Sequence, residues 1–485
     1  PADDVVTKSL RFNRGDSPKL TRTFGTPTSQ KKVTISFWMK LSEQGDGSTA
    51  YCGVISTGSA YTEYTVVKLD GGTTNTIAFE EVASGAYKSN RGTSRAFRDM
   101  GAWMHCVHVI DTTDSTADDR SKLYINGVRE TTFSTSYATY ALNYDTNWSA
   151  SGEEIGIGLD IATAGPYFGG YLADIHYIDG QALDHTYFAE EDTTTGQWKP
   201  KAYSGTGYGN NGFRLDFSDS SDIGNDVSGN DNDFTATNLA ASDVMEDTPT
   251  DNYCVLNALD TSAAFTFSEG NLGAIWSDTD YCRNRGTIGM ASGKWYFEFM
   301  QDGAAQNANV MIWGVKTSDV TLTTDSFGYG SAMADEWVLT DTGAVANNGS
   351  GTADVLSDPA NTDIIQVAVD MDAKKIWFGV NDTWDGDPAA GTGNRYSNLP
   401  DSVSPLIGIA GGTVSGYQRA TKANFGQDPT FAGSKSGGAT SEFFYTPPSG
   451  YLSLSTGNLP TPTIAKPSEH FNTLTYTGNA STGRS

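Results

Sequence analysis

The sequence has few cysteines and no long hydrophobic run. Its four cysteines are Cys52, Cys106, Cys254 and Cys282, and no C-x-x-C pair occurs. Their number and scatter argue against a disulfide scaffold, and Cys106 beside His108 on one strand face is interpreted as core packing, because two further metal ligands are missing. Without an apolar run of 18 residues, no membrane insertion is expected. The first residues also lack the basic and apolar stretches of a signal peptide.

Charged residues are scarce and mostly acidic. They make up 18% of the chain, with 58 Asp and Glu against 31 Lys and Arg, and give a net charge of −27. Such a surface repels phosphate backbones and anionic headgroups, so nucleic acid is not an expected partner. Apolar residues account for 37% of the chain and glycines number 54. This composition is sufficient for hydrophobic cores and suits strands and tight turns.

Period-two alternation predicts an all-β fold. Val33, Ile35, Phe37 and Met39 alternate with mostly polar residues, as in a half-buried strand. The segment 363–384, "DIIQVAVDMDAKKIWFGVNDTW", reads as two apolar strands joined by a polar turn. The helical candidate is short, at residues 184–191.

The pattern predicts two antiparallel, jelly-roll-like β-sandwiches in series. A Gly/Asn/Asp-rich connector separates them, and we expect it to pack on the first domain because its phenylalanines and Leu215 need burial. The predicted limits are 1–196 for the first sandwich, 197–257 for the connector, 258–445 for the second sandwich and 446–485 for an extended Pro-rich tail.

Three segments of the first sandwich carry a family resemblance. "VTISFWMKL", "GAWMHCVHVIDTTDSTADDRSKLYINGVRE" and "YFGGYLADIHYIDGQALDHTYFAE" occur in this order. Together they resemble a laminin-G/concanavalin-like lectin domain. The resemblance implies a sandwich whose loops can recognise a glycan.

The second sandwich resembles a SPRY domain. The segments "SGKWYFEFM", "VMIWGVK", "DIIQVAVDMDAKKIWFGVN" and "KANFGQ" follow the order of that family's strands. The resemblance implies that the hairpin is core, with one residue set pointing inward: Ile365, Val367, Val369, Ile376, Phe378 and Val380. Gln366 departs from the glycine usual in the family, which puts a local backbone approach in doubt.

The order of these modules resembles tail-fibre-like virion appendage proteins of tailed phages of marine bacteria. The resemblance implies a homotrimer, made in the host cytoplasm and displayed on the virion. Its partners would be other virion proteins and a host-surface glycan or protein. Two alternatives stay open: a purely structural virion protein, either a head-decorating fibre or a tail component, and a secreted bacterial lectin or adhesin.

Catalytic motifs are missing from the sequence. Concanavalin-like glycoside hydrolases place paired carboxylates in a Glu-x-Asp-x-x-Glu strand, and this pattern does not occur. Gly-x-Ser-x-Gly, His-Glu-x-x-His and phosphate-binding glycine loops are also missing. The sequence therefore predicts a non-enzymatic protein.

Four aromatic residues are the predicted carbohydrate-binding positions. Trp148, Tyr167, Trp337 and Trp384 lie in Gly/Asp/Asn-rich surroundings, where an exposed ring could stack on a pyranose. The alternative for each is a buried anchor.

Calcium is the cofactor that the sequence suggests, without establishing it. Asp111, Asp114, Asp118 and Asp119 gather in one stretch, and Asp222 and Asp226 belong to a second acidic stretch. Carboxylate oxygens on loops suit Ca²⁺. The alternative is that these residues organise turns, which aspartate does well.

Overall fold

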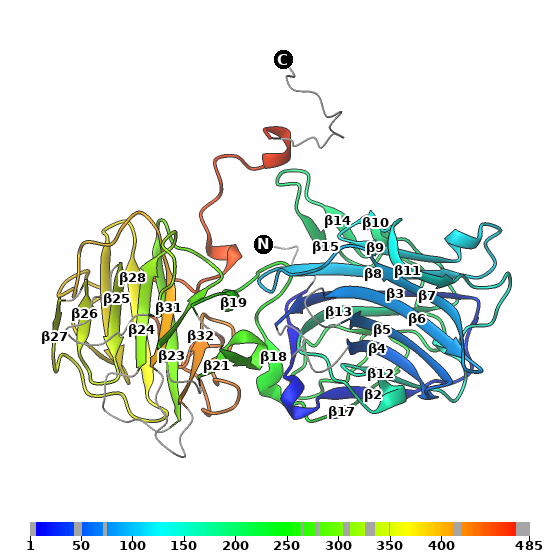
Figure 1. The fold of residues 1–485 in the computed structure, drawn as a ribbon, viewed down its shortest axis with the longest axis horizontal. Coiled ribbons are helices and arrows are strands. Elements are labelled where there is room, and N and C mark those ends of the chain that lie inside the picture. Colours follow the sequence, from blue (N-terminus) through cyan, green and yellow to red (C-terminus); the bar gives the residue numbers. More distant parts are fainter. Residues whose placement is uncertain are drawn as a thin grey trace.

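The computed structural model describes residues 6–42, 51–70, 75–262, 265–276, 281–303, 311–324, 335–348, 350–410 and 419–471. Within these ranges the chain forms 32 β-strands and nine 3₁₀ helices, and the strand pairs within the sheets are antiparallel. The predicted all-β class, with sandwich-like packing, is confirmed. Two sandwiches lie side by side (Figure 1).

The first sandwich consists of two eight-stranded sheets, here called sheets I and II. Sheet I contains β1 (Ser9–Phe12), β3 (Lys32–Leu41), β8 (Trp103–Asp111), β9 (Ser121–Ile125), β10 (Val128–Arg129), β13 (Gly170–Asp179), β16 (Phe213–Leu215) and β18 (Val244–Met245). Sheet II contains β2 (Lys19–Thr23), β4 (Tyr51–Ala60), β5 (Glu63–Asp70), β6 (Thr76–Ala83), β7 (Ala86–Thr93), β11 (Phe133–Ala138), β12 (Glu154–Ile157) and β17 (Thr235–Thr237).

The second sandwich consists of two seven-stranded sheets, III and IV. Sheet III contains β19 (Leu256–Thr261), β22 (Tyr281–Gly286), β24 (Met311–Thr317), β25 (Glu336–Thr340), β26 (Val345–Asn347), β27 (Ser350–Thr352) and β31 (Val403–Ala410). Sheet IV contains β20 (Thr266–Ser268), β21 (Gly273–Trp276), β23 (Lys294–Gly303), β28 (Ile364–Asp370), β29 (Lys375–Val380), β30 (Thr383–Trp384) and β32 (Arg419–Asn424).

The remaining elements are short. Strands β14 (Ala189–Glu191) and β15 (Trp198–Pro200) pair with each other. The 3₁₀ helices are η1 (Arg14–Asp16), η2 (Ala117–Asp119), η3 (Asn147–Ser149), η4 (Ile161–Thr163), η5 (His185–Tyr187), η6 (Ala241–Asp243), η7 (Glu269–Asn271), η8 (Thr456–Asn458) and η9 (Pro467–Glu469). In the described ranges, no helix is long and apolar enough to cross a bilayer.

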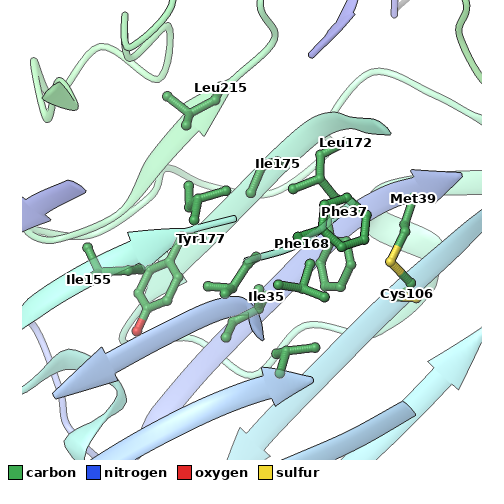
Figure 2. Close-up of a cluster of buried hydrophobic side chains, with 14 of the residues drawn as sticks. Ile35, Phe37, Met39, Cys106, Ile155, Phe168, Leu172, Ile175, Tyr177 and Leu215 are labelled. Carbon is green, nitrogen blue, oxygen red and sulfur yellow. The ribbon is translucent and has the colours of Figure 1, made fainter. Parts of the chain in front are cut away.

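The core of the first sandwich forms where the predicted alternation places it. Val33, Ile35, Phe37 and Met39 of β3 are fully buried between the sheets. Figure 2 shows three of them within a cluster of buried side chains from several strands. Cys106 belongs to the same cluster, and all four cysteines are buried thiols. The predicted packing role of Cys106 is thus confirmed.

Residues of the expected connector lie against the first sandwich. β16 pairs with β13, and β17 pairs with β2, so this stretch extends both sheets. Phe213, Phe217 and Phe234 join the first core. Burial of these rings gives the segment a fixed position despite its many turn residues.

The hairpin at 363–384 is β28 and β29, and it contributes both faces to packing. The six side chains predicted to point inward all belong to the core of the second sandwich. Ala368 and Trp377 on the opposite face are also fully buried, beneath Phe443 and Tyr451 of the segment that follows β32. Sheet IV is therefore covered on its outer side as well.

Gln366 is accommodated by hydrogen bonds. The side chain is fully buried, and its Nε2 donates to the Tyr296 hydroxyl at 3.1 Å. Its Oε1 accepts from the backbone N–H of Asp382 at 2.7 Å. Both ends of the amide are satisfied, so a glutamine can occupy this position of the strand.

The helix predicted at residues 184–191 does not form. Residues 184–191 form the short η5 followed by β14, whose backbone pairs with β15. Strand pairing with β15 satisfies these backbone groups, and a helix would leave β15 without its partner.

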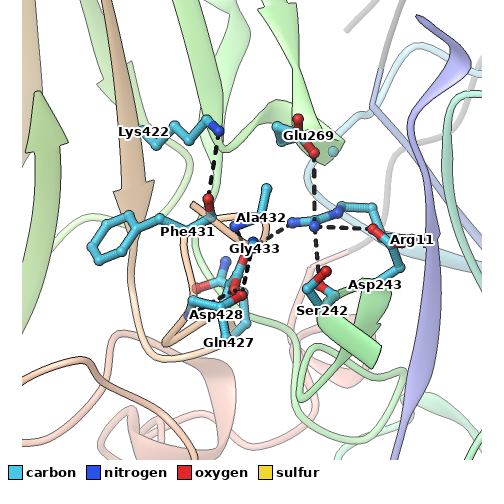
Figure 3. Close-up of polar contacts among 12 residues, drawn as sticks. Arg11, Ser242, Asp243, Glu269, Lys422, Gln427, Asp428, Phe431, Ala432 and Gly433 are labelled. Atoms are coloured by element: carbon cyan, nitrogen blue, oxygen red, sulfur yellow. Dashed lines mark hydrogen bonds and ion pairs between the residues drawn. The ribbon is translucent and has the colours of Figure 1, made fainter. Parts of the chain in front are cut away.

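A buried polar cluster joins the two sandwiches (Figure 3). The guanidinium of Arg11 on β1 is 0% exposed and lies 2.9 Å from Asp428, which follows β32. The same group contacts Asp243 at 3.1 Å and Glu269 at 3.7 Å. Burial alone would lower the pKa of Arg11, but the three carboxylates raise it above its usual value. Arg11 therefore stays charged inside the interface.

Candidate functional site

The outer faces of the four sheets differ in character. Sheets I, III and IV each carry a buried apolar cluster on the side away from the sandwich core. In sheet I this cluster includes Val107, Val109 and Phe188, and in sheet III it includes Ile312 and Leu406. The outer face of sheet II carries tyrosines and polar groups instead, which makes it the candidate for ligand binding.

Strand register builds this face from four strands. Across β4, β5, β6 and β7, directly paired residues form rows that point away from the core, since Val67 and Phe79 between them point into it. The first row is Gly58, Tyr64, Val82 and Tyr87; the second is Ser56, Val66, Glu80 and Asn90; the third is Gly53, Lys68, Ala78 and Gly92.

We call the resulting surface the tyrosine face. Its members are Tyr51, Tyr61, Tyr64, Lys68, Glu80, Tyr87 and Asn90. Tyr61, in the turn between β4 and β5, is 71% exposed, and Tyr87 is 44% exposed. Glu80 and Asn90 are nearly buried at its base. Exposed rings above buried polar groups give a surface that can both stack on a ligand and hydrogen-bond to it.

Glu80 is the centre of the polar base. Its carboxylate lies 2.9 Å from the Lys68 ammonium, accepts from Nδ2 of Asn90 at 3.0 Å and from the Tyr64 hydroxyl at 3.4 Å. Burial alone would lower the pKa of Lys68, but Glu80 and Asp70 raise it. Lys68 therefore stays protonated near neutral pH. Oδ1 of Asn90 is buried and accepts no hydrogen bond from any described residue.

Two tyrosines of the face have raised pKa values. Burial raises the pKa of Tyr64, and Glu80 raises it further, with contributions from Tyr87 and Tyr51. Burial likewise raises the pKa of Tyr51, whose hydroxyl donates to Asp160 at 2.8 Å. The hydroxyls of Tyr51 and Tyr64 are therefore neutral hydrogen-bond donors near neutral pH.

Loop 159–167 borders the face on the β4 side. The Ser56 hydroxyl donates to the backbone oxygen of Leu159 at 2.9 Å, and the backbone N–H of Gly53 donates to Pro166 at 3.2 Å. A Cβ on Gly53 would lie 2.2 Å from the backbone nitrogen of Asp160, so glycine is required for this close approach. Burial raises the pKa of Asp160.

Two of the predicted sugar-binding aromatics are buried anchors. Trp148 is 0% and Trp337 is 3% exposed. The Trp148 indole donates to the Tyr140 hydroxyl at 3.2 Å, and that of Trp337 donates to Asn398 at 3.0 Å. Neither ring has a face open to a sugar. These two expectations are wrong because the indole N–H finds an internal partner and the ring fills the core.

The other two predicted aromatics lie nearer the surface. Trp384 is half-buried and packs against the cluster that covers sheet IV, with its ring centroid 6.2 Å from that of Tyr296. Tyr167 is half-buried in the loop that borders the tyrosine face, bridged to Leu159. Of the four, Tyr167 therefore lies beside the candidate site.

The predicted calcium residues each hold a turn or an ion pair. Asp111 accepts from the N–H of Thr113 and lies 3.2 Å from the Lys32 ammonium. Asp114 accepts from the N–H of Thr116. The remaining pairs of the loop are Asp118 with Arg91 and Asp119 with Arg129.

The second acidic stretch also organises its own backbone. Asp226 is buried and accepts three backbone N–H groups, from Arg214, Ser228 and Asn232. Asp222 is exposed, and its N–H caps a turn on Asp219. Across the described ranges, no three His, Cys, Asp or Glu side chains are placed to hold a metal ion. Except for Asp222, these carboxylates are engaged in turn hydrogen bonds or ion pairs with Lys or Arg.

A Ser–His contact in sheet I has the wrong polarity for nucleophilic catalysis. Nε2 of His105 lies 2.8 Å from the Ser36 hydroxyl, while Nδ1 accepts from the Trp198 indole at 3.1 Å. Indole can only donate, so the proton of the neutral imidazole sits on Nε2. Burial lowers the pKa of His105 to about 3, which keeps the ring neutral. His105 therefore donates to Ser36 and cannot act as its base.

Sequence reasoning missed the tyrosine face. The signal was present in "AYTEYTVVKL" and "GAYKS", where tyrosines occur near the ends of alternating strands. Their convergence depends on the register of four strands, which no single strand specifies.

A family model matches most of the first sandwich. Residues 14–186 match the model of the concanavalin A-like lectin/glucanases superfamily. The resemblance of this half to a laminin-G/concanavalin-like lectin domain is thereby confirmed. No curated protein matches the chain.

Solved structures show weaker likenesses. The SPRY domain of human HERC1 is 16% identical with a TM-score of 0.28, covering 35% of this chain and 96% of that one. The heptameric SAP-like pentraxin of Limulus polyphemus is 17% identical with a TM-score of 0.24, covering 34% and 71%. Domain 4 of AbnA, an extracellular arabinanase of Geobacillus stearothermophilus, in complex with arabinotriose, is 16% identical with a TM-score of 0.24, covering 32% and 64%.

At these TM-scores the likenesses assign neither a family nor a function to this chain. None of these three proteins is a phage virion protein.

Proposed function

We propose that the chain is a non-catalytic carbohydrate-binding protein and that the tyrosine face of its concanavalin A-like domain is the binding surface. The observation that carries the proposal is the register of β4 to β7, which gathers tyrosines over a hydrogen-bonded Glu80. Sugar rings present apolar faces that stack on aromatic rings, and hydroxyl groups that pair with carboxylates and amides.

The charges of the face favour a neutral or cationic sugar. Glu80, Asp70 and Asp160 accompany the single ammonium of Lys68, which is already paired. A ligand hydroxyl can supply the donor that Oδ1 of Asn90 lacks. An acidic sugar would meet net negative charge at this face.

The absence of catalysis is part of the proposal. Glu80 is paired with Lys68, and Asp160 caps η4 by accepting from the N–H of Ala162 at 3.1 Å. Both carboxylates are engaged in hydrogen bonds that position neighbouring residues. A glycosidase would need one free acid and one free base on either side of the scissile bond.

A glycan array followed by calorimetric titration tests the function. Tyr61→Ala and Tyr87→Ala should each weaken binding several-fold, since one aromatic contact is worth about 1 kcal/mol. Phe471→Ala is the matched control, because Phe471 is an aromatic side chain with 73% exposure on the C-terminal segment. Equal binding by all variants would contradict the site, and release of sugar products from the bound glycan would contradict the non-catalytic role.

The wider proposal is that the chain is a virion appendage of a tailed phage that recognises a host-surface glycan as a homotrimer, made in the host cytoplasm and displayed on the particle. It is supported by the order of the lectin-like domain, the connector and the SPRY-like strands. Sedimentation equilibrium should give the mass of three chains, and antibodies against the chain should label phage particles. A trimer that labels particles but binds no glycan would favour the structural virion role, and absence of label would favour a bacterial lectin or adhesin.

A further inference from the structure

A cleft of about 430 Å³ opens where the two sandwiches meet. One wall comes from residues 98–102, which follow β7 of the first sandwich. The other comes from Asn252, Asn257 and Leu259 at the junction and from Thr287 and Ile288 of the second sandwich. The volume is in the range of small-ligand sites. None of the lining residues belongs to the tyrosine face, so this cleft is a separate site.

The walls of the cleft are fixed by buried polar contacts. Asn252 donates from Nδ2 to the backbone oxygen of Gly101 at 2.6 Å, and its Oδ1 accepts from Lys40 at 2.7 Å. Lys40 is itself paired with Asp247 at 2.7 Å, and both side chains are 0% exposed. A Cβ on Gly101 would lie 3.2 Å from the Thr287 methyl group, which shows how closely the domains approach. The cleft is thus preorganised, which reduces the entropic cost of binding.

The rim offers unused hydrogen-bonding groups of complementary types. Arg98 is exposed and makes no ion pair or hydrogen bond with any residue that the structure describes. Asn257 accepts at Oδ1 from the N–H of Leu259 at 3.0 Å, while its Nδ2 donates to none of the described residues. Asp99 uses Oδ1 to accept from the N–H of Gly101 at 2.8 Å. Leu259, 54% exposed, adds an aliphatic surface.

We propose that this cleft binds an acidic saccharide through a hexuronic acid residue. The Arg98 guanidinium matches a carboxylate bidentately. Asn257 and Asp99 then serve as donor and acceptor for ring hydroxyls, and Leu259 covers the apolar side of the ring. A single guanidinium next to the Asp99 carboxylate suits a monoanion better than a doubly charged phosphate. The inference does not rest on the tyrosine face, whose charges select against acidic sugars.

Calorimetric titration of the full chain with digalacturonic acid, and with its methyl ester, tests the proposal. The acid should bind saturably, and Arg98→Ala should weaken it by about tenfold or more, the usual loss for a charge-assisted pair. The wild-type chain should bind the ester about as weakly as the variant binds the acid. Equal affinity for acid and ester, or no saturable binding of the acid, would overturn the proposal.

Tyr87→Ala separates this site from the tyrosine face. The variant should retain digalacturonate affinity while losing affinity for the neutral glycan, and Arg98→Ala should do the reverse. If Tyr87→Ala weakens digalacturonate binding and Arg98→Ala does not, the acidic sugar binds at the tyrosine face and the cleft assignment is wrong. Because Arg98 is exposed, its replacement leaves folding intact, which thermal unfolding checks.

Discussion

Replacing Arg11 with methionine should both destabilise the chain and loosen the link between the sandwiches. The side chain is fully buried and contacts Asp428, Asp243 and Glu269. Removing one partner of a buried ion pair costs about 3–5 kcal/mol, because the remaining charge stays buried. Asp428 keeps hydrogen bonds from the N–H and hydroxyl of Thr430, at 3.0 and 2.7 Å. We therefore expect a loss near the lower end, about 3 kcal/mol.

Guanidinium unfolding followed by tryptophan fluorescence and calorimetry measures this loss. The contacts of Arg11 come from both sandwiches, so Arg11→Met should also separate the unfolding of the two units into distinct steps. Arg95→Met is the matched control: the Arg95 side chain is 50% exposed in its pair with Glu130, and such pairs are worth about 0–1 kcal/mol. A loss for Arg11→Met no larger than that of the control would refute the interface argument.

Three further outcomes are expected. Phe378→Ala should cost about 3–5 kcal/mol of unfolding free energy by chemical denaturation, while half-buried Trp384→Ala should cost less than half as much; equal losses would contradict the burial of these positions. Burial raises the pKa of Glu81 from 4.5 to about 7, so its contribution to stability is full below pH 4.5 and falls by about 3 kcal/mol as pH rises to about 7. Glu81→Gln should flatten unfolding free energy over that window, and an unchanged slope would argue against the shift. A calcium chelator should leave Tm unchanged, because the Asp226 carboxylate already accepts three backbone N–H groups and Asp118 and Asp119 are paired with arginines; a fall in Tm would restore the calcium hypothesis.

Sequence periodicity predicted the strands because successive side chains of a strand alternate between the buried core face and the opposite face. The alternation in β3 and in the hairpin of β28 and β29 correctly identified the side chains facing each core. It could not show that the opposite face of that hairpin is also covered. The covering residues, Phe443 and Tyr451, lie some 60 residues further along the chain in a stretch without strand character. The alternation predicts which face of a strand packs in the core, but it does not predict that a distant segment packs on the other face.

The predictions of sugar-binding tryptophans failed where exposure was inferred from the polar residues next to them in the sequence. Trp148 and Trp337 have polar neighbours in sequence, yet their indoles bond to Tyr140 and Asn398 inside the protein. A tryptophan in a loop is amphipathic, and its ring fills a core as readily as it stacks on a sugar. Which of the two occurs depends on whether the fold brings a hydrogen-bond partner to the indole N–H, and the sequence alone does not reveal that partner.

Coverage of the sheets decides where a ligand can bind. On sheet IV, the buried carboxylate of Glu298 accepts from the N–H groups of Phe444 and Tyr445 at 2.9 and 2.8 Å and so fastens the covering segment. A ligand on that face would have to break these bonds and expose Trp377, which is 0% exposed. Displacing this hydrogen-bonded segment would oppose binding, because exposing each buried aromatic side chain to water costs about 1.5–3 kcal/mol of free energy. On the outer face of sheet II, by contrast, the rings of Tyr61 and Tyr87 are 71% and 44% exposed, and this is why we propose the glycan-binding surface on the first sandwich.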